Sequence, residues 1–265
     1  MRDSWHSLRA FTQARIALGS AGSAVRTQSH LDFQLAHAEA RDAVWKDWDY
    51  ASFLISMQNQ SASAIHLDTQ AETRTLYLQR PDLGRRLNSK SLATLAKSGL
   101  SGFDLALIVS NGLSTTSVER HALPFLNELM PSFKRYGISA TPIFSVPNGR
   151  VALSDEIGVA LKTRASLIII GERPGLSAAD SLGAYITLSP ARENTDAQRN
   201  CLSNIREPDG LAYRTAAEKI CYLILKGFQL GLGGVALKDD SPDDPRLLAQ
   251  SLELMTHQSP ETDED

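Results

Sequence analysis

The sequence predicts an α/β protein with a Rossmann-like, mainly parallel sheet flanked by helices and preceded by an N-terminal helical region. Three observations predict this class. Short apolar runs recur between residues 73 and 188, stretches with helical spacing separate them, and residues 1–60 carry helical spacing instead. Strands that alternate with helices form parallel sheets covered on both faces, because each connecting helix packs back on the sheet.

The N-terminal region, residues 1–73, is predicted to consist of helices followed by a linker. Leu31, Leu35 and Ala38 fall on one stripe of a helix, and small side chains continue beside that stripe. Residues 58–73 are polar and are typical of a connector between elements. The α/β domain is therefore predicted to span residues 74–235.

Five runs between residues 73 and 188 are predicted to be strands. Each has the length of a strand rather than that of a helix, and helical stretches or turn residues separate one run from the next. The runs are Thr73–Leu78, Asp104–Val109, Ala140–Val146, Ser166–Ile170 and Ala184–Leu188.

Four stretches are predicted to be helices. The stretch Thr116–Met130 opens with a sequence typical of a capping box. Pro124 should kink or break this helix because proline lacks the N–H of a helix interior. A further helix has Ser154 as a plausible N-cap. The last predicted helix ends at Gly231, since glycine adopts the left-handed conformation that closes a helix. The stretches are Ser89–Ala96, Thr116–Met130, a helix from Ser154 and Leu211–Leu230.

Residues 236–265 are predicted to form an acidic, disordered tail. Acidic side chains dominate this segment from Asp239 onward, where Arg246 is the single arginine or lysine. Like charges repel one another and keep their hydration, so such a composition favours a solvated segment.

The charge and the cysteine content restrict the class of function. A formal net charge of −3 argues against a nucleic-acid partner, which would call for a basic stripe. Cys201 and Cys221 cannot build a disulfide framework, which fits a reducing cytosol. The sequence opens with no secretory signal and has no apolar run long enough to span a bilayer, so we expect a cytoplasmic protein without a membrane partner.

Two loops that follow apolar strands mark the predicted ligand site. Ser110–Ser114 follows one buried-type strand and Gly171–Gly175 follows another. Ligands of open α/β sheets bind at the carboxyl ends of strands, where backbone donors and side chains converge. Neither loop carries a nucleophile–base pair or a phosphate-binding glycine pattern, so the chain is predicted to be a binder with no catalytic residue of its own.

Two residues are candidates for a role in chemistry. Glu172 could accept hydrogen bonds from a ligand amide or hydroxyl, and an ion pair with Arg173 explains its position about equally well. Cys201 is predicted to lie in a polar, loop-like stretch before the last helix. It could be a nucleophile, but the sequence places no histidine beside it, and a packed, unreactive cysteine is favoured.

Other patterns give weaker signals. His37-Ala38-Glu39 resembles half of a zinc deaminase signature, but the Pro-Cys-x-x-Cys half is missing. His30, Asp32 and His37 lack the spacing of a metal site, so no metal is predicted. The arginines of Arg80–Leu87 could bind an anionic group beside a turn, or could lie on a solvated loop.

Six short sequence strings, taken together, resemble those of a known family. The order of the strings matches the small (light) subunit of ethanolamine ammonia-lyase, an adenosylcobalamin-dependent enzyme, over roughly residues 25–230. The strings are RPDLGRRL at 80–87, SNGLST at 110–115, DEIG at 155–158, GERPGL at 171–176, Ser189-Pro190, and CLSNI at 201–205.

The resemblance implies a subunit of a heteromeric carbon–nitrogen lyase. A larger, barrel-shaped subunit would bind ethanolamine and supply most catalytic side chains, and cobalamin would lie between the two subunits. The reaction is ethanolamine to acetaldehyde and ammonia, started by homolysis of the cobalt–carbon bond of adenosylcobalamin. The protein then binds and orients the cofactor and the substrate and excludes water from them, while the cofactor carries the radical chemistry.

The resemblance also implies three cofactor-binding positions and makes residues 74–235 the cobalamin-contacting domain. These positions are Val151 after Gly149-Arg150, Glu172 in GERPG and Cys201 in CLSNI. The rim of a corrin bears neutral amides, so scattered acceptors and apolar contacts suit it better than a charge cluster does.

The chain departs from the family at three places. Asn111 stands where some relatives have aspartate, and one residue fewer separates Pro190 from Cys201. Enterobacterial relatives carry an N-terminal extension linked to microcompartment packaging, and the chain starts near the shared region. We therefore expect a cytoplasmic location and regard a bacterial microcompartment as doubtful.

Two other classes of function remain open at this point. One is a stand-alone Rossmann-like module that binds a nucleotide or another small molecule, although no G-x-G-x-x-G sequence follows the first strand. The other is a scaffold subunit that stabilises the large subunit without contacting the cofactor.

Overall fold

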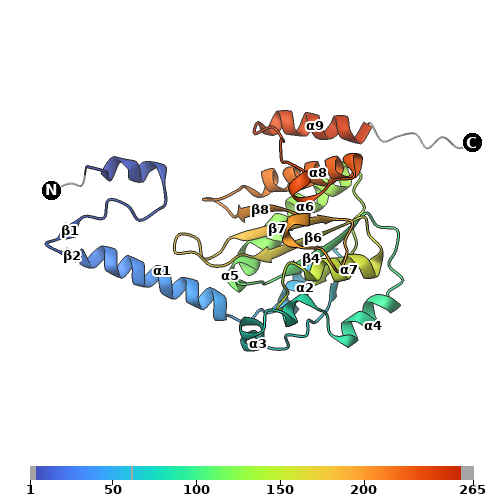
Figure 1. The fold of residues 1–265 in the computed structure, drawn as a ribbon, viewed down its shortest axis with the longest axis horizontal. Helices are drawn as coiled ribbons and strands as arrows, with labels where there is room; N and C mark the ends of the chain where they lie inside the picture. Colours follow the sequence, from blue (N-terminus) through green and yellow to red (C-terminus); the bar gives the residue numbers. More distant parts are fainter. Residues whose placement is uncertain (1–3, 61, 258–265) are drawn as a thin grey trace, which may run out of the picture.

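A six-stranded mixed sheet forms the centre of the computed structural model, which describes residues 4–60 and 62–257 (Figure 1). The first four strands in spatial order run parallel, whereas β7 is antiparallel to β6 and β8 is antiparallel to β7. In spatial order the strands are β3 (Ala64–His66), β5 (Ile143–Ser145), β4 (Leu105–Ser110), β6 (Ala165–Gly171), β7 (Leu182–Leu188) and β8 (Arg199–Ile205).

The predicted α/β class is confirmed, but the sheet is mixed, and a Rossmann-like, mainly parallel sheet is not confirmed. The reason lies in the connections after β6. Residues 172–181 contain no helix, and residues 189–198 contain only one short 3-10 turn. A parallel neighbour needs a crossover connection, usually a helix, so the chain returns antiparallel at each of these two points.

Three sequence predictions about single elements are wrong. Thr73–Leu78 is not a strand, because the Thr73 side chain accepts a hydrogen bond from Leu76 N at 3.2 Å and begins helix α3 (Arg74–Gln79). The connector at residues 58–73 contains β3, which pairs with β5. The segment around Cys201 is not a loop but edge strand β8, whose polar residues face solvent at most alternate positions.

Helices cover both faces of the sheet, because alternate residues of each strand point to opposite sides. Leu105, Leu107 and Val109 belong to the core cluster that includes residues of α2, α6 and α8. Ala106 and Ile108 belong to a second cluster with residues of α4 and α7. These helices are α2 (Tyr50–Asn59), α6 (Leu123–Arg135), α8 (Tyr213–Leu230), α4 (Ser89–Lys97) and α7 (Leu153–Leu161).

The second predicted helix is not broken at Pro124, since the helical backbone continues from Thr115 to Arg135, but its hydrogen-bond pattern changes just before this proline. A short α5 (Thr115–Ser117) and a π-helical turn, η3 (Val118–Ala122), precede α6, and Pro124 lies in the first turn of α6, where its missing N–H costs little. The N-cap is Ser114 rather than the predicted Thr116, since the Ser114 hydroxyl accepts from Ser117 N.

The remaining helix ends agree partly with the predictions. Helix α7 begins at Leu153, so Ser154 lies inside it and donates its hydroxyl to Val151 O instead of capping. Helix α8 ends at Gly231, whose left-handed conformation (φ +65°) confirms the predicted stop. Among the described residues no helix combines the length and apolar character needed to cross a bilayer.

Part of the expected tail is a helix. Helix α9 (Pro245–His257) packs against α8 and buries Leu248 and Leu252 (Figure 1). Apolar residues at four-residue spacing give this helix one face that packs on the core. Burial of this face favours a folded helix more strongly than the preceding acidic residues favour a solvated segment. Residues 258–265 of the expected tail lie outside the described residues.

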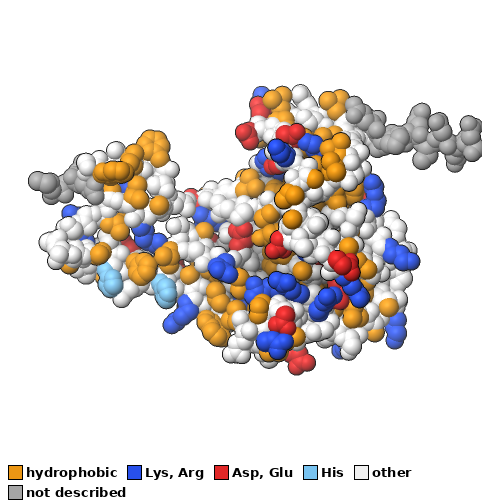
Figure 2. All heavy atoms as spheres, in the orientation of Figure 1, with side chains coloured by type: hydrophobic (Ala, Val, Ile, Leu, Met, Phe, Trp, Pro, Cys, Tyr) orange, Lys and Arg blue, Asp and Glu red, His pale blue; other side chains and the backbone are white. Residues whose placement is uncertain are grey.

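An N-terminal arm, residues 4–45, extends from one end of the sheet domain (Figure 1). It contains a 3-10 turn, a two-stranded hairpin and helix α1 (Thr27–Trp45). Leu31 and Leu35 of the predicted stripe are 51% and 61% exposed, and hydrophobic side chains are visible along the arm in Figure 2. The apolar stripe of α1 is therefore largely unburied in the chain alone.

Two acids of the DEIG string hold separate parts of the chain together. Asp155 accepts from Arg199 at 2.7 Å, and both side chains are buried. Glu156 accepts from Leu87 N at 2.6 Å, and its other oxygen lies 3.6 Å from Arg86. Helix α7 therefore anchors the RPDLGRRL string and the start of β8, which gives Arg86 a structural contact.

The loops after β4 and β6 meet through glycines. Leu113 N donates to Gly171 O at 2.9 Å, and Gly112 adopts φ +50° at the approach. A Cβ on Gly171 would lie 2.2 Å from Ser114 O and 2.4 Å from Asn111 O. The two loops can touch only because no side chain stands between them.

We predict that Gly171→Ala lowers the free energy of unfolding by about 1–3 kcal/mol, because the added methyl group forces these two loops apart. Gly175→Ala is the matched control, since its Cβ would meet only Ala178 O at an ordinary 3.5 Å. Chemical denaturation of the two variants measures the difference. Equal stabilities would show that the contact tolerates a side chain.

Candidate functional site

The candidate site lies at the carboxyl edge of the parallel strands, where three loops are linked by hydrogen bonds. Besides the contact between Leu113 and Gly171, the loop after β5 joins them. Asn148 N donates to Asn111 Oδ1 at 2.8 Å, and Gly149 N donates to Ser110 Oγ at 2.9 Å. The predicted convergence of the Ser110–Ser114 and Gly171–Gly175 loops is confirmed.

Asn111 has a structural role in this arrangement. It is 1% exposed, and its amide donates to Thr115 Oγ1 at 3.0 Å while its oxygen accepts from Asn148 N. The Thr115 hydroxyl in turn donates to Lys46 O at 2.6 Å. The buried side chain therefore joins two loops and, through Thr115, the end of α1.

A hollow of about 480 Å³ opens beside these loops and contains two of the three predicted cofactor residues. Val151 and Glu172 both line it, together with residues that the sequence did not single out for this role. Its lining comprises Tyr77, Leu113, Arg150, Val151, Ile170, Gly171, Glu172, Arg173, Tyr185 and Ser203.

The Glu172 carboxylate is held by three donors from the chain itself. Glu172 Oε2 accepts from Ser181 Oγ at 2.6 Å and from Asn204 N at 3.0 Å, and Oε1 accepts from Ser203 Oγ at 2.5 Å. The alternative ion pair with Arg173 is not formed among these contacts. A carboxylate has about four acceptor positions, so one position on Oε1 is left for a ligand.

The loop after Glu172 is fixed at its far end. Asp180 accepts from Arg120 at 2.8 Å and lies 3.3 Å from His121 Nε2, while Ser114 Oγ donates to Ala179 O at 2.8 Å. Burial is the largest single influence on the Asp180 carboxyl and raises its pKa, but the interactions with Arg120 and His121 together lower the pKa by more, so that it lies below its usual value. The anchored loop therefore keeps Glu172 and Arg173 at the hollow.

Cys201 lies beside the hollow rather than in its lining. It is an exposed residue of β8 that stands directly across from Tyr185, which does line the hollow. Partial loss of hydration raises the pKa of the Cys201 thiol, and the negative charge of Glu172 raises it further, although a hydrogen bond with Tyr185 opposes both. No histidine is among its interacting groups, which favours the interpretation as an unreactive contact.

Tyr77 and Arg150 form a wall of the hollow that Glu172 also lines, and the sequence did not predict this role for either residue. The Tyr77 hydroxyl donates to Gly149 O at 3.1 Å, and the Arg150 guanidinium lies over the Tyr77 ring at 4.6 Å. Arg150 was visible beside Val151 in the sequence, whereas Tyr77 was assigned to a strand and so had no predicted place at this edge.

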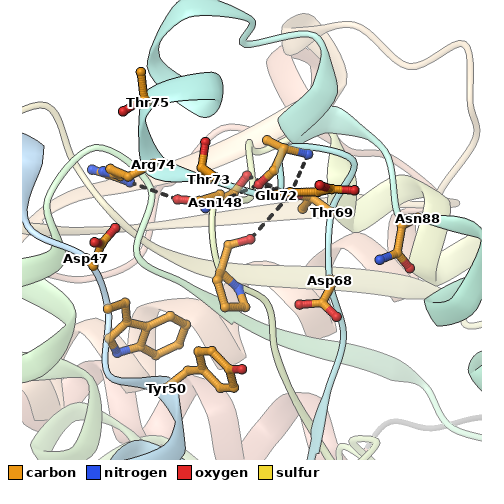
Figure 3. Close-up of a pocket in the computed structure, with 13 residues that line it drawn as sticks. Asp47, Tyr50, Asp68, Thr69, Glu72, Thr73, Arg74, Thr75, Asn88 and Asn148 are labelled. Carbon is orange, nitrogen blue, oxygen red and sulfur yellow. Dashed lines mark hydrogen bonds between the residues drawn. The ribbon is translucent and has the colours of Figure 1, made fainter.

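A second hollow, of about 660 Å³, lies between residues 47–50, at the start of α2, and residues 68–75, at the start of α3 (Figure 3). Its carboxylates are Asp47, Asp68 and Glu72, and Arg74 lies at its inner end. Arg74 is 5% exposed and donates to Gly112 O at 2.6 Å and to Val44 O at 2.7 Å. Three carboxylates against one arginine make this hollow acidic, whereas two arginines and one carboxylate line the hollow at Val151.

The other candidate groups do not form sites. Within residues 4–60 and 62–257, no group of three or more histidine, cysteine or acidic side chains could hold a metal ion. Arg80 of the RPDLGRRL string pairs with Asp82 on the surface at 2.7 Å, and Arg85 is exposed. Cys221 is buried in α8, where loss of hydration raises its pKa strongly.

The fold and the site define an α/β protein that presents a polar, arginine-bearing hollow at the carboxyl edge of its sheet. Comparison with known proteins gives the family. The model of the family described as ethanolamine ammonia-lyase light chain (EutC) matches residues 2–238, so the chain belongs to this family. The resemblance seen in the ordered strings is confirmed.

Relatives with this name match the chain over most of their length. The chain is 48% identical over 250 residues to an ethanolamine ammonia-lyase small subunit of Xanthomonas campestris pv. campestris, covering 93% of this chain and 91% of the relative. It is 46% identical over 240 residues to the protein of the same name in Pseudomonas putida, covering 89% and 88%. The corresponding Azotobacter vinelandii protein is 47% identical over 241 residues, covering 89% and 88%.

We predict that Cys201 reacts with iodoacetamide more slowly than free cysteine at about pH 8, because its raised pKa leaves less of the nucleophilic thiolate. Tyr185→Phe should slow the reaction further, since it removes the hydrogen bond that lowers this pKa. Mass spectrometry of the alkylated chain distinguishes Cys201 from the buried Cys221. A Cys201 that reacts faster than free cysteine would instead indicate an activated thiol.

Proposed function

We propose that this chain is the small subunit of a heteromeric, adenosylcobalamin-dependent ethanolamine ammonia-lyase and that it covers one side of the cobalamin. The reaction is the conversion of ethanolamine to acetaldehyde and ammonia, and the partner is the large subunit. One observation carries the proposal: in a member of this family, Val151 and Glu172 line one hollow at the ligand-binding edge of the sheet.

The residues of this hollow suit part of a corrinoid. Val151 offers an apolar contact, Glu172 keeps one free acceptor position for an amide N–H, and Ser203 and Arg150 add polar groups. A corrinoid is far larger than the drug-sized molecules that such a volume encloses, so this hollow can hold only one side of it. The remaining surface would be covered by the partner subunit.

The work of this chain in the reaction is to bind and orient. Bound adenosylcobalamin supplies radical chemistry by homolysis of its cobalt–carbon bond. Glu172, fixed by its three internal donors, would hold a rim amide in place, and Val151 would exclude water beside it. No nucleophile–base pair is among the lining residues of the described chain, so the catalytic side chains are assigned to the large subunit.

Cys201 would contribute at the rim of the same surface. Its thiol stands on the outer strand, against the Tyr185 ring that lines the hollow. The resemblance assigns it a cofactor contact, and its exposed position leaves it reachable by a molecule larger than the hollow itself. A contact of this kind needs no thiolate.

The N-terminal arm is proposed as a surface for the large subunit. Exposed apolar side chains on it include Leu31, Phe33 and Leu35. The segment before α1 is tied to the site edge, since Arg15 donates to Leu176 O at 2.9 Å and Arg206 donates to Gln13 at 3.1 Å. An apolar surface that adjoins the cofactor hollow fits the same partner that closes this hollow.

We predict that Glu172→Gln weakens cobalamin retention by the complex of the two subunits about 3- to 10-fold, the loss expected for one hydrogen bond of roughly 1 kcal/mol. Glutamine keeps an oxygen for Asn204 N and a donor for a serine hydroxyl, so the fold survives. Equilibrium dialysis with cobalamin measures the affinity.

Glu193→Gln is the matched control, because Glu193 is exposed and has no described role at the hollow. An unchanged affinity in Glu172→Gln would remove Glu172 from the site. The broader proposal is tested by the large subunit alone. If that subunit bound cobalamin and released ammonia as well without this chain as with it, the proposed function would be wrong.

We predict that the double variant Leu31→Ser/Leu35→Ser weakens association with the large subunit at least tenfold, because apolar area that the partner covers is lost. The control is Leu247→Ser/Leu254→Ser, which removes leucines of similar exposure from α9. Analytical ultracentrifugation of the mixed subunits measures association, and thermal unfolding checks stability. An equal effect of both pairs would exclude a specific role for the arm.

A further inference from the structure

The Arg150 guanidinium is a cation of the hollow without a carboxylate partner. Among the described residues no acidic side chain lies within ion-pair distance of it, and its Nε is buried without a hydrogen-bond acceptor. Glu172 lines the same hollow but is not this partner, because its carboxylate accepts from Ser181, Ser203 and Asn204 and forms no ion pair with Arg150. A buried donor without an acceptor is destabilising, and an acceptor on a bound molecule would remove this cost.

The position of Arg150 is fixed from several sides. Its backbone N–H donates to Gly84 O at 2.8 Å, and its guanidinium rests on the ring of Tyr77, which is fully buried. Gly84 allows this approach, since a Cβ there would lie 2.8 Å from Asn148 O. A guanidinium held in one place loses little freedom when it binds an oxygen.

A second cation increases the positive charge at this wall. Arg74 lies over the same Tyr77 ring at 5.0 Å, and its Nη2 is also buried without an acceptor. Arg173 lines the hollow as well and is exposed. Arg74 lines the second hollow rather than this one, but its charge lies on the same ring. Two like charges on one ring repel each other, so an anionic oxygen at Arg150 offsets part of that repulsion and accepts from the unpartnered guanidinium.

We propose that Arg150 binds the phosphodiester of the nucleotide side chain of cobalamin. This inference rests on the proposed function. The amides on the rim of a corrin are neutral, whereas the phosphodiester carries a negative charge. A guanidinium suits a phosphate because its planar N–H groups can donate to two oxygens at once. Arg150 is therefore a specificity-determining residue that distinguishes a complete cobalamin from a corrinoid that lacks the nucleotide.

The experiment compares two corrinoids in the complex of this chain with the large subunit. Cyanocobalamin carries the phosphodiester nucleotide, and dicyanocobinamide lacks it. Dissociation constants of both are measured spectroscopically for the unaltered complex and for complexes with Arg150→Met, Arg150→Lys and Arg192→Met. Size-exclusion chromatography checks that each variant assembles with the large subunit.

We expect Arg150→Met to weaken cyanocobalamin binding at least tenfold and dicyanocobinamide binding less than twofold, as for loss of a charge-assisted hydrogen bond. The loss of cyanocobalamin affinity in Arg150→Lys should be smaller than in Arg150→Met, because lysine keeps the charge but cannot donate to two oxygens in a plane. Arg192→Met, which removes an equal charge from an exposed position outside the hollow, should weaken both corrinoids by less than threefold.

Several outcomes would overturn the inference. Equal losses for both corrinoids would show that Arg150 only supports the fold of the hollow, and an unchanged affinity would show no contact. A loss of assembly would identify a carboxylate of the large subunit as the partner of Arg150. The proposed function fails separately, if the large subunit binds cyanocobalamin equally well without this chain.

Discussion

The contact between the loops after β4 and β6 is the constraint on which the site depends. Leu113 N bonds to Gly171 O, and the absence of a side chain on Gly171 lets the Asn111 and Ser114 carbonyls approach. This contact sets Gly171 at one end of the hollow and fixes the direction in which Glu172 leaves its strand. The loop after β5 then joins through Asn111, so one hydrogen-bonded group positions residues from three separate strands.

The sequence strings that mark the family are mostly parts of this framework rather than ligand contacts. Asp155 pairs with Arg199, 44 residues later in the chain, and Glu156 holds Leu87 N, 69 residues earlier. Helix α7 therefore links the RPDLGRRL string to the start of β8. Gly84 lets one of these strings approach the loop after β5 and bonds to Arg150 N. Their joint function is to build a firm wall of loops, which is what a site that only binds and orients requires.

Much of the fold follows from local sequence, and the exceptions have physical reasons. The long apolar runs of β4 and β6 predict central strands, because strands buried on both faces need no polar residues. Strand β3 is three residues long and carries no such run, and β8 is an edge strand with polar residues outward, so neither was predicted. At the site, position after a strand predicted Glu172, whereas Tyr77 and Arg150 meet only through tertiary packing.

The reversed direction of β7 separates the site from the turn that joins β7 to β8. Because β7 begins beside Glu172 and runs away from it, residues 189–198 lie at the opposite edge of the sheet. The capping box at Thr195 and Gln198 closes this turn locally. A change in the length of this hairpin therefore falls far from the hollow, so evolution can lengthen or shorten the turn without altering what the protein binds.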